Sequence, residues 1–128
     1  MNNTNFDKYH PEIDNWFNFY FKESNLKSDC LIVVLSPSTG FMLKNYDLMH
    51  DALYISEKTN SYYTFSIDIL SDVISNFLND LDKTVVVYVG SSKSGFGAIN
   101  LGRMQPKLNK LQKSFSLSFS PVTRVYPL

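Results

Sequence analysis

The segment of this sequence best suited to chemistry is a run of small residues behind an apolar run. Residues 90–98 read GSSKSGFGA and follow the β-branched run TVVVYV. A nucleophile held on a sharp turn between a strand and a helix needs small residues two positions before and two positions after it. Counting from Gly90, the nucleophile position is Ser92, and its small neighbours are Gly90 and Ser94. The spacing therefore predicts a serine nucleophile for acyl transfer.

Two further residues complete the predicted turn. The backbone N–H of Lys93, at the expected start of a helix, would point at an oxyanion that develops on the substrate. Gly95 would let that helix pack close to the strand. Ser94 stands where the G-x-S-x-G pattern has its last glycine. Serine is small enough to keep the turn, with some crowding.

Other glycine-containing loops fit this segment less well. A phosphate-binding loop of the Walker type ends in Gly-Lys-Ser/Thr, whereas Lys93 here precedes Gly95. A dinucleotide fingerprint that began at Gly95 would need its third glycine at Asn100, too far into the helix. A tight turn without chemistry and an anion site at the start of the helix both stay open as alternatives.

Hydrophobic patterning predicts the elements that would position these residues. Continuous β-branched runs at 31–35 and 84–89 are typical of strands buried on both faces, and 52–55 and 115–119 are weaker strands. Apolar residues recur at three- and four-residue steps over 67–81, which indicates a helix. A second helix follows the turn. This alternation predicts an α/β fold with a mainly parallel sheet and flanking helices.

The beginning of the chain admits two interpretations. Phe17, Phe19 and Phe21 fall on one face at a period of two, and these residues are aromatic, which favours a strand. A helix is the alternative, with one face made of Ile13, Trp16, Phe17 and Tyr20. Residues 1–14 are predicted to be a flexible lead-in, and 15–128 a single α/β domain.

A second loop belongs to the same predicted site. Ligands of parallel α/β sheets bind beyond the carboxyl ends of the strands. The run 31–35 ends in such a loop, as does the strand before Gly90. The candidates for substrate binding in this loop are Ser36, Ser38, Thr39 and Gly40.

Composition excludes several classes of function. The 128 residues carry twelve basic and twelve acidic side chains, so no net charge attracts nucleic acid or an anionic membrane. The single cysteine, Cys30, excludes an internal disulfide and a cysteine zinc site. No apolar run approaches the roughly 20 residues of a membrane span, and the first residues do not resemble a signal peptide. We expect a cytoplasmic protein without cofactor or metal ion.

The chain resembles the α/β-hydrolase superfamily, and within it a bacterial group associated with capsular polysaccharide biosynthesis. The resemblance covers roughly residue 31 to the end. Its carriers, besides the elbow at 90–98, are the strand Leu53-Tyr54-Ile55, the loop Asn60-Ser61-Tyr62-Tyr63, the helix 67–78 and Phe119-Ser120-Pro121. It implies that the four predicted strands are the third to sixth of a hydrolase sheet, within a partial three-layer sandwich.

The same resemblance implies a chemistry and a substrate class. The second oxyanion donor would come from the loop between Ser36 and Gly40, although Pro37 has no N–H to donate. The substrate would be a small acyl ester or a sugar-linked acyl group, attacked by the hydroxyl of Ser92.

The resemblance also exposes what this chain lacks. Hydrolases of this type supply their acid and then their histidine after the sixth strand, and the sequence ends before either. His50 is expected at the opposite edge of the sheet and His10 in the lead-in, so neither is expected to serve as the base. We therefore expect a truncated hydrolase-like core that is inactive alone. The alternative is a non-catalytic interaction module, whose open sheet edge pairs with a second copy or with a complementing downstream polypeptide.

Overall fold

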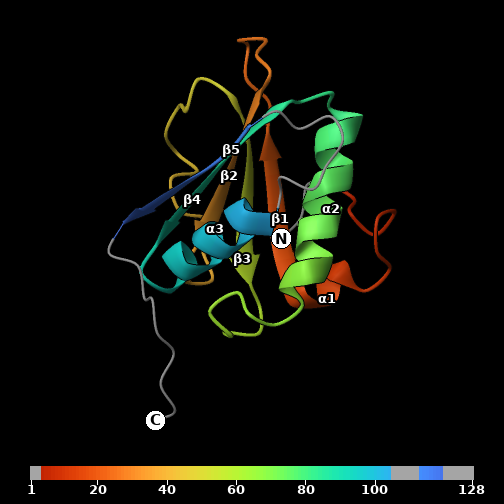
Figure 1. Ribbon diagram of the computed structural model, residues 1–128, viewed down its shortest axis with the longest axis vertical. Helices are drawn as coiled ribbons and strands as arrows, with labels where there is room; N and C mark the ends of the chain where they lie inside the picture. Colours follow the sequence, from red (N-terminus) through yellow and green to blue (C-terminus); the bar gives the residue numbers. More distant parts are fainter. Residues whose placement is uncertain (1–3, 105–112, 120–128) are drawn as a thin grey trace.

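Four parallel strands and one antiparallel strand form the centre of this protein (Figure 1). The computed structural model describes residues 4–104 and 113–119. Within them the strands are β1 (Phe17–Lys22), β2 (Cys30–Ser36), β3 (Asp51–Glu57), β4 (Val85–Ser91) and β5 (Lys113–Phe119). Their order in the sheet is β1-β3-β2-β4-β5. The α/β class and the mainly parallel sheet are therefore confirmed.

The buried strands are the ones with continuous apolar sequences. β2 lies between β3 and β4 and pairs parallel with both, so that Val34 faces Tyr54 on one side and Val89 on the other. Parallel neighbours need a crossover, and α2 (Ile67–Asp80) connects β3 to β4 while α3 (Lys93–Met104) follows β4. These crossovers bring the carboxyl ends of β2, β3 and β4 to one edge of the sheet.

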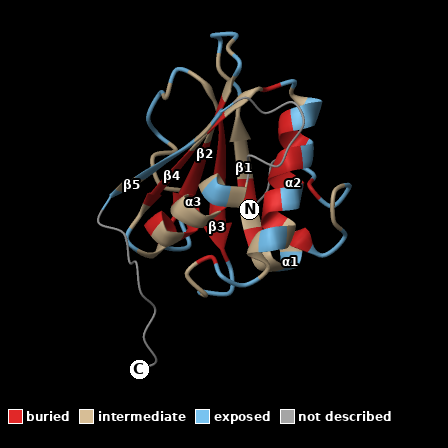
Figure 2. Cartoon of the chain, in the orientation of Figure 1, coloured by how far each residue is buried: buried red, intermediate tan, exposed pale blue. Residues whose placement is uncertain are grey.

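The described helices all pack on the same face of the sheet (Figure 2). Side chains of α2 and α3 and Ile13 of the short α1 (Ile13–Trp16) join one core cluster with alternate residues of the strands. The opposite face forms a smaller cluster around Val34 and Tyr54. Residues of the loop after β2, among them Phe41 and Leu48, cover it. In residues 4–104 and 113–119, helices thus form one layer, whereas a three-layer sandwich has two.

The segment before β1 contributes to the core. Phe6 is fully buried and stacks on Phe19, with ring centroids 4.4 Å apart, and contacts Phe77 of α2 at 4.9 Å. Within residues 4–14, which the sequence predicts as a flexible lead-in, Phe6 and Ile13 are therefore part of the core. The strand prediction for 17–22 is confirmed, and the alternative helix exists only as the four residues of α1.

Two buried tyrosines give a matched test of polar burial. The Tyr88 hydroxyl is buried without a hydrogen-bond partner among the described residues, and burial raises the Tyr88 pKa well above its ordinary value. The Tyr63 hydroxyl donates to the Ser36 carbonyl at 2.6 Å. Tyr88→Phe is expected to raise the free energy of unfolding by about 1 kcal/mol, and Tyr63→Phe to lower it by about 1 kcal/mol. Urea unfolding measures both, and a loss of stability in Tyr88→Phe would contradict the assignment.

Candidate functional site

The predicted turn is a single residue long. β4 ends at Ser91 and α3 begins at Lys93, so Ser92 alone joins the strand to the helix. Ser92 is exposed and has φ of 55°, and it is one of eight described residues other than glycine in the left-handed region. A backbone held in this region costs about 1–3 kcal/mol and is frequent at functional sites. The turn therefore has the strained, exposed serine that a nucleophile elbow requires.

Glycine at position 90 is required by the closeness of strand and helix. A Cβ atom built on Gly90 would lie 2.5 Å from the carbonyl carbon of Ser94 and 2.7 Å from the backbone nitrogen of Gly95. Real Cβ atoms essentially never approach so closely, so a side chain at position 90 would force the first turn of α3 to move. The small residue two positions before Ser92 is thus a steric requirement of this structure.

Ser94 stabilises the turn through its side chain. Its buried hydroxyl donates to the Ser91 carbonyl and accepts from the Ser91 N–H, both at 2.8 Å. The backbone N–H of Gly95 donates to the Ser92 carbonyl at 3.0 Å. The N–H of Ser92 donates to the Phe119 carbonyl at the end of β5, also at 3.0 Å. Serine in place of the usual glycine therefore adds two hydrogen bonds to the elbow.

Close packing of α3 on its surroundings is visible at two glycines further along the helix. A Cβ on Gly97 would lie 2.6 Å from Cβ of Tyr63, and a Cβ on Gly102 would overlap the hydroxyl of Ser116 on β5. The sequence assigns this packing role to Gly95 alone. The structure describes for Gly95 the hydrogen bond to Ser92 and a carbonyl that accepts from Ser118 at 3.0 Å.

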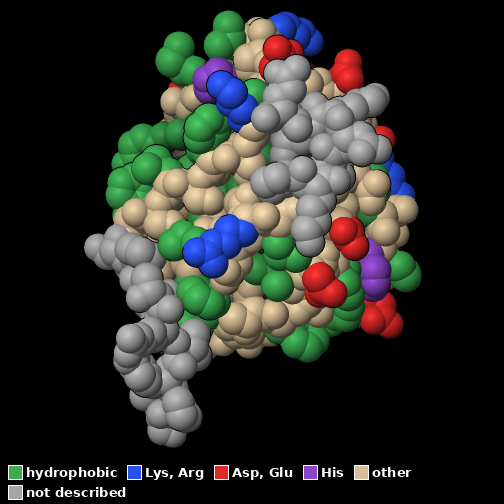
Figure 3. Space-filling model, in the orientation of Figure 1, with side chains coloured by type: hydrophobic (Ala, Val, Ile, Leu, Met, Phe, Trp, Pro, Cys, Tyr) green, Lys and Arg blue, Asp and Glu red, His purple; other side chains and the backbone are tan. Residues whose placement is uncertain are grey.

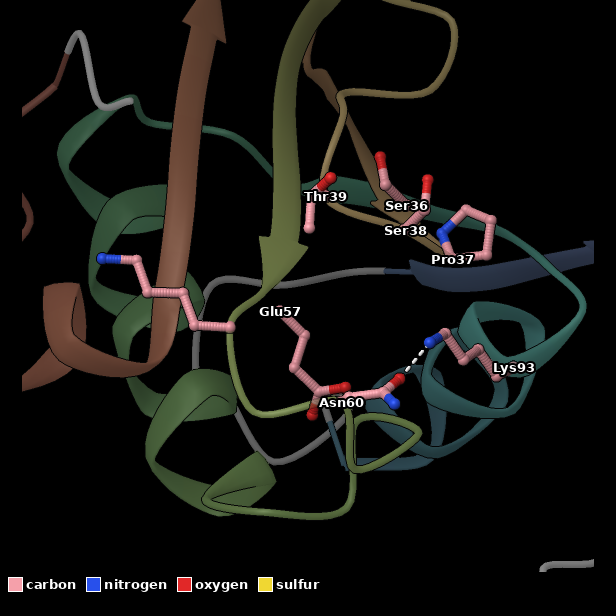
Figure 4. A pocket seen from close by; sticks show the side chains of 8 residues that line it. Ser36, Pro37, Ser38, Thr39, Glu57, Asn60 and Lys93 are labelled. Carbon is pink, nitrogen blue, oxygen red and sulfur yellow. Dashed lines mark hydrogen bonds between the residues drawn. The ribbon is translucent and has the colours of Figure 1, made fainter.

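A pocket of about 390 Å³ lies at the carboxyl edge of the sheet, beside the start of α3 (Figure 4). It is lined by residues that are polar or charged except for Pro37: Ser36, Pro37, Ser38, Thr39, Glu57, Lys58, Asn60 and Lys93. The structure therefore brings four predicted site residues together: Ser36, Ser38, Thr39 and Lys93. Ser92 and Gly40 are not among the described residues that line it.

The sequence did not identify three residues of this pocket, Glu57, Lys58 and Asn60, and Glu57 makes the most hydrogen bonds of the three. It ends β3 and is largely buried, and its carboxylate accepts from the backbone N–H of Ser61 at 2.8 Å and of Tyr63 at 3.2 Å. The hydroxyls of Thr59 and Ser61 also donate to it. The sequence feature that could have identified Glu57 is its position two residues after the predicted strand 52–55, since every parallel strand end at this edge can contribute to a site.

The loop after β3 joins both sides of the pocket. The Tyr63 hydroxyl donates to the Ser36 carbonyl of β2, and burial together with the nearby Glu57 carboxylate raises the Tyr63 pKa. At the other side the Lys93 ammonium donates to the Asn60 side-chain carbonyl, as Figure 4 shows. The pocket is therefore held by contacts from one loop to β2 and to α3.

The hydroxyl of Ser36 is already engaged. Ser36 is 2% exposed, and its Oγ accepts from the backbone N–H of Met42 at 2.6 Å. This bond positions the loop that begins with Pro37. Ser38 and Thr39 are exposed in that loop. Among the predicted substrate-binding residues, these two therefore present the more accessible hydroxyls at the pocket.

Both histidines of the chain lie away from the turn. His50 precedes β3 and its Nδ1 is 2.8 Å from the Ser28 hydroxyl, at the amino edge of the sheet. His10 lies beside Trp16, with ring centroids 5.5 Å apart, next to β1. β1 and β4 are separated by β3 and β2, which corresponds to roughly 14 Å at the usual strand spacing. The described residues therefore hold no imidazole at Ser92.

Residues 4–104 and 113–119 contain no group of three or more His, Cys, Asp or Glu side chains arranged to hold a metal ion. In the same residues no helix has the length and the apolar character needed to cross a membrane.

Comparison with known proteins adds no neighbour. No protein-family model, curated protein or solved structure matches this chain.

Proposed function

We propose that this chain is an α/β-hydrolase-like core of the serine esterase or acyl-transfer type, with Ser92 at the nucleophile position. The observation that carries the proposal is the backbone of Ser92. A left-handed serine forms the whole connection between a buried parallel strand and a helix. It lies at the carboxyl edge of the sheet, where ligands of such folds bind.

The order of the strands supports the same proposal. With β2 to β5 taken as the third to sixth strands of a hydrolase sheet, the fourth lies outside the third, and the fifth and sixth follow on its other side. β1 pairs antiparallel with β3 on the outside of this set of strands. We propose that this sheet and the single helix layer of the described residues form part of a hydrolase-like sandwich.

The chemistry would be attack of the Ser92 hydroxyl on an acyl carbon. The N–H of Lys93, the first residue of α3, would stabilise the developing oxyanion, with help from the positive end of the helix. A second donor would come from the loop between Ser36 and Gly40, in which only Pro37 has no N–H to donate. The pocket beside it is lined mainly by polar and charged residues, which suits the hydroxyl-bearing part of an acyl ester, such as a sugar-linked one. By resemblance, we propose a role in polysaccharide biosynthesis.

Among the residues that the structure describes, no imidazole lies near Ser92 to deprotonate its hydroxyl. A serine hydroxyl without an adjacent base is a weak nucleophile at neutral pH. His10 and His50 lie near β1 and at the amino edge of the sheet. We therefore propose that the chain is nearly inactive alone and that a complementing polypeptide would have to supply the base and its acid.

A fluorophosphonate probe tests this proposal, with the labelled residue identified by mass spectrometry. We expect slow labelling of Ser92 that increases with pH and with added imidazole as an external base. Ser92→Ala should abolish it, whereas Ser24→Ala, at a serine beside Asp51 on the amino edge of the sheet, should leave it unchanged. Labelling of Ser28, whose hydroxyl contacts His50, would instead move the nucleophile to the opposite edge and overturn the assignment.

A second candidate function is a non-catalytic interaction module that pairs through an open sheet edge. β5 favours it, because no strand among the described residues pairs with the outer edge of β5. The two candidates differ in the reactivity of Ser92, since a pure interaction module would give no labelling specific to that residue.

A further inference from the structure

The two faces of β5 have different environments. Every second residue is a serine whose hydroxyl donates to a carbonyl of α3: Ser114 to Gly102, Ser116 to Ala98 and Ser118 to Gly95, at 3.1, 2.7 and 3.0 Å. These bonds fasten the strand to the helix. The side chains between them must therefore point to the opposite face of the sheet.

That opposite face carries an exposed apolar strip. Phe115, Leu117 and Phe119 are 51%, 50% and 52% exposed. They lie on the same face as Val87 and Val89 of β4, because Val87 pairs with Phe115 and Val89 with Leu117. Figure 3 shows hydrophobic side chains on the left of the molecule, where Figure 1 places the loop after β2 beside β4 and β5. Three large apolar side chains in alternation at a sheet edge are a strong signal for an interaction surface.

The edge itself lacks the usual protection against pairing. Natural edge strands carry charged side chains, prolines or bulges that prevent association. The sequence of β5 is KSFSLSF, so its one charged residue is Lys113 at its first position, and it contains no proline. It pairs with β4 over its whole length without a bulge. The outer edge of β5 is therefore a regular template for another strand.

We propose that this edge pairs with β5 of a second copy of the chain, antiparallel and centred on Ser116. This inference rests on the open edge named in the second candidate function and does not depend on Ser92. A seven-residue strand pairs completely with its copy only in this register, which sets Leu117 opposite Phe115 of the second copy. All six apolar side chains then line the same face, because antiparallel pairing about a two-fold axis keeps the faces aligned.

Charge separates this arrangement from a parallel one. In the antiparallel register Lys113 lies opposite Phe119 of the second copy, so the two lysines stand at opposite ends of the paired strands. Parallel pairing in register would place the two lysines directly opposite each other, which is destabilising. A two-fold axis also closes the assembly at two copies, whereas a head-to-tail contact between copies would add further copies without limit.

Light scattering over a range of protein concentrations tests the pairing. We expect a concentration-dependent dimer, weakened at least tenfold by Leu117→Lys. Leu26→Lys is the matched control, because Leu26 is also a leucine and is 49% exposed, and it should leave the dimer unchanged. Leu117→Ser is a milder second variant, and circular dichroism checks that each variant is folded.

Other outcomes would overturn the inference. A monomer at all concentrations excludes pairing with a second copy, and labelling of Ser92 remains a separate test of the proposed function. A dimer equally strong in Leu117→Lys would place the interface elsewhere. Lys113→Ala removes the charge, so it should leave the dimer unchanged in the antiparallel register and strengthen a parallel dimer, in which the two lysines would face each other. A marked change in this variant would indicate that Lys113 faces its own copy and would overturn the register.

Discussion

Gly90→Ala is expected to lower the free energy of unfolding by about 3 kcal/mol. The new methyl group would meet backbone atoms of Ser94 and Gly95, 2.5 and 2.7 Å away in the first turn of α3. Backbone in a helix cannot rotate away as a side chain can, so α3 would have to shift from β4. The shift would also disturb the left-handed turn at Ser92, and labelling of Ser92 should fall with stability.

Gly40→Ala is the control for this substitution. A Cβ on Gly40 would meet nothing within 4 Å, and this exposed loop glycine has no positive φ. Its free energy of unfolding should therefore stay within about 0.5 kcal/mol of the unsubstituted protein. Urea unfolding followed by circular dichroism measures both variants. Equal stability of Gly90→Ala and Gly40→Ala would show that strand and helix are not packed as described.

Glu57→Ala is the second substitution for which we expect a large effect, a loss of about 3 kcal/mol. The carboxylate accepts from the backbone N–H groups of Ser61 and Tyr63 and from two hydroxyls. Removing it leaves these donors without their acceptor in a largely buried place, where each unsatisfied donor costs about 1–3 kcal/mol. Asn60, Tyr62 and Tyr63 in the same loop have positive φ, which this network helps to hold.

Glu23→Ala, at an exposed glutamate before β2, is the matched control and should change stability by less than about 0.5 kcal/mol. Glu57→Gln keeps the shape of the side chain and should fall between the two. Hydrogen exchange gives a local readout, because the amides of Ser61 and Tyr63 should exchange faster in Glu57→Ala. Unchanged exchange at these amides would show that Glu57 does not hold the loop.

The elements of this fold were predictable because their signals are local. The runs at 31–35 and 84–89 are apolar and β-branched throughout, which suits strands covered on both faces, and both are strands in the structure. The periodicity over 67–81 corresponds to α2, which ends one residue earlier. The place of the turn at Ser92 follows from Gly90, since a sharp strand-to-helix turn has strict steric needs within a few residues.

The pocket was only half predictable. Ser36, Ser38 and Thr39 follow an obvious strand, and Lys93 follows the elbow. Glu57 and Asn60 enter the pocket because β3 lies next to β2 and its loop reaches back to Ser36 and Lys93. That neighbourhood depends on strand order, and no local pattern in the segment 52–61 specifies which strand lies beside it.

The burial of the segment before β1 and the orientation of β5 also could not be predicted from local sequence. Phe6 lies in a polar stretch interrupted by Pro11, yet it is buried between Phe19 and Phe77, which come from distant parts of the chain. The sequence of β5 shows alternation but not which half of it faces α3. The serines do, since their hydroxyls bond to helix carbonyls, and the apolar half is left exposed.

The amino-acid sequence by itself determined the class of fold, the buried strands, the longer helices and the place of the turn at Ser92. Each of these depends on side-chain periodicity or on steric fit within a few neighbouring residues. Tertiary structure alone decided the strand order, the side of the sheet on which the helices lie, the membership of Glu57 in the pocket and the exposure of Phe115, Leu117 and Phe119. These features depend on contacts between residues far apart in the chain, which no local pattern in the sequence specifies.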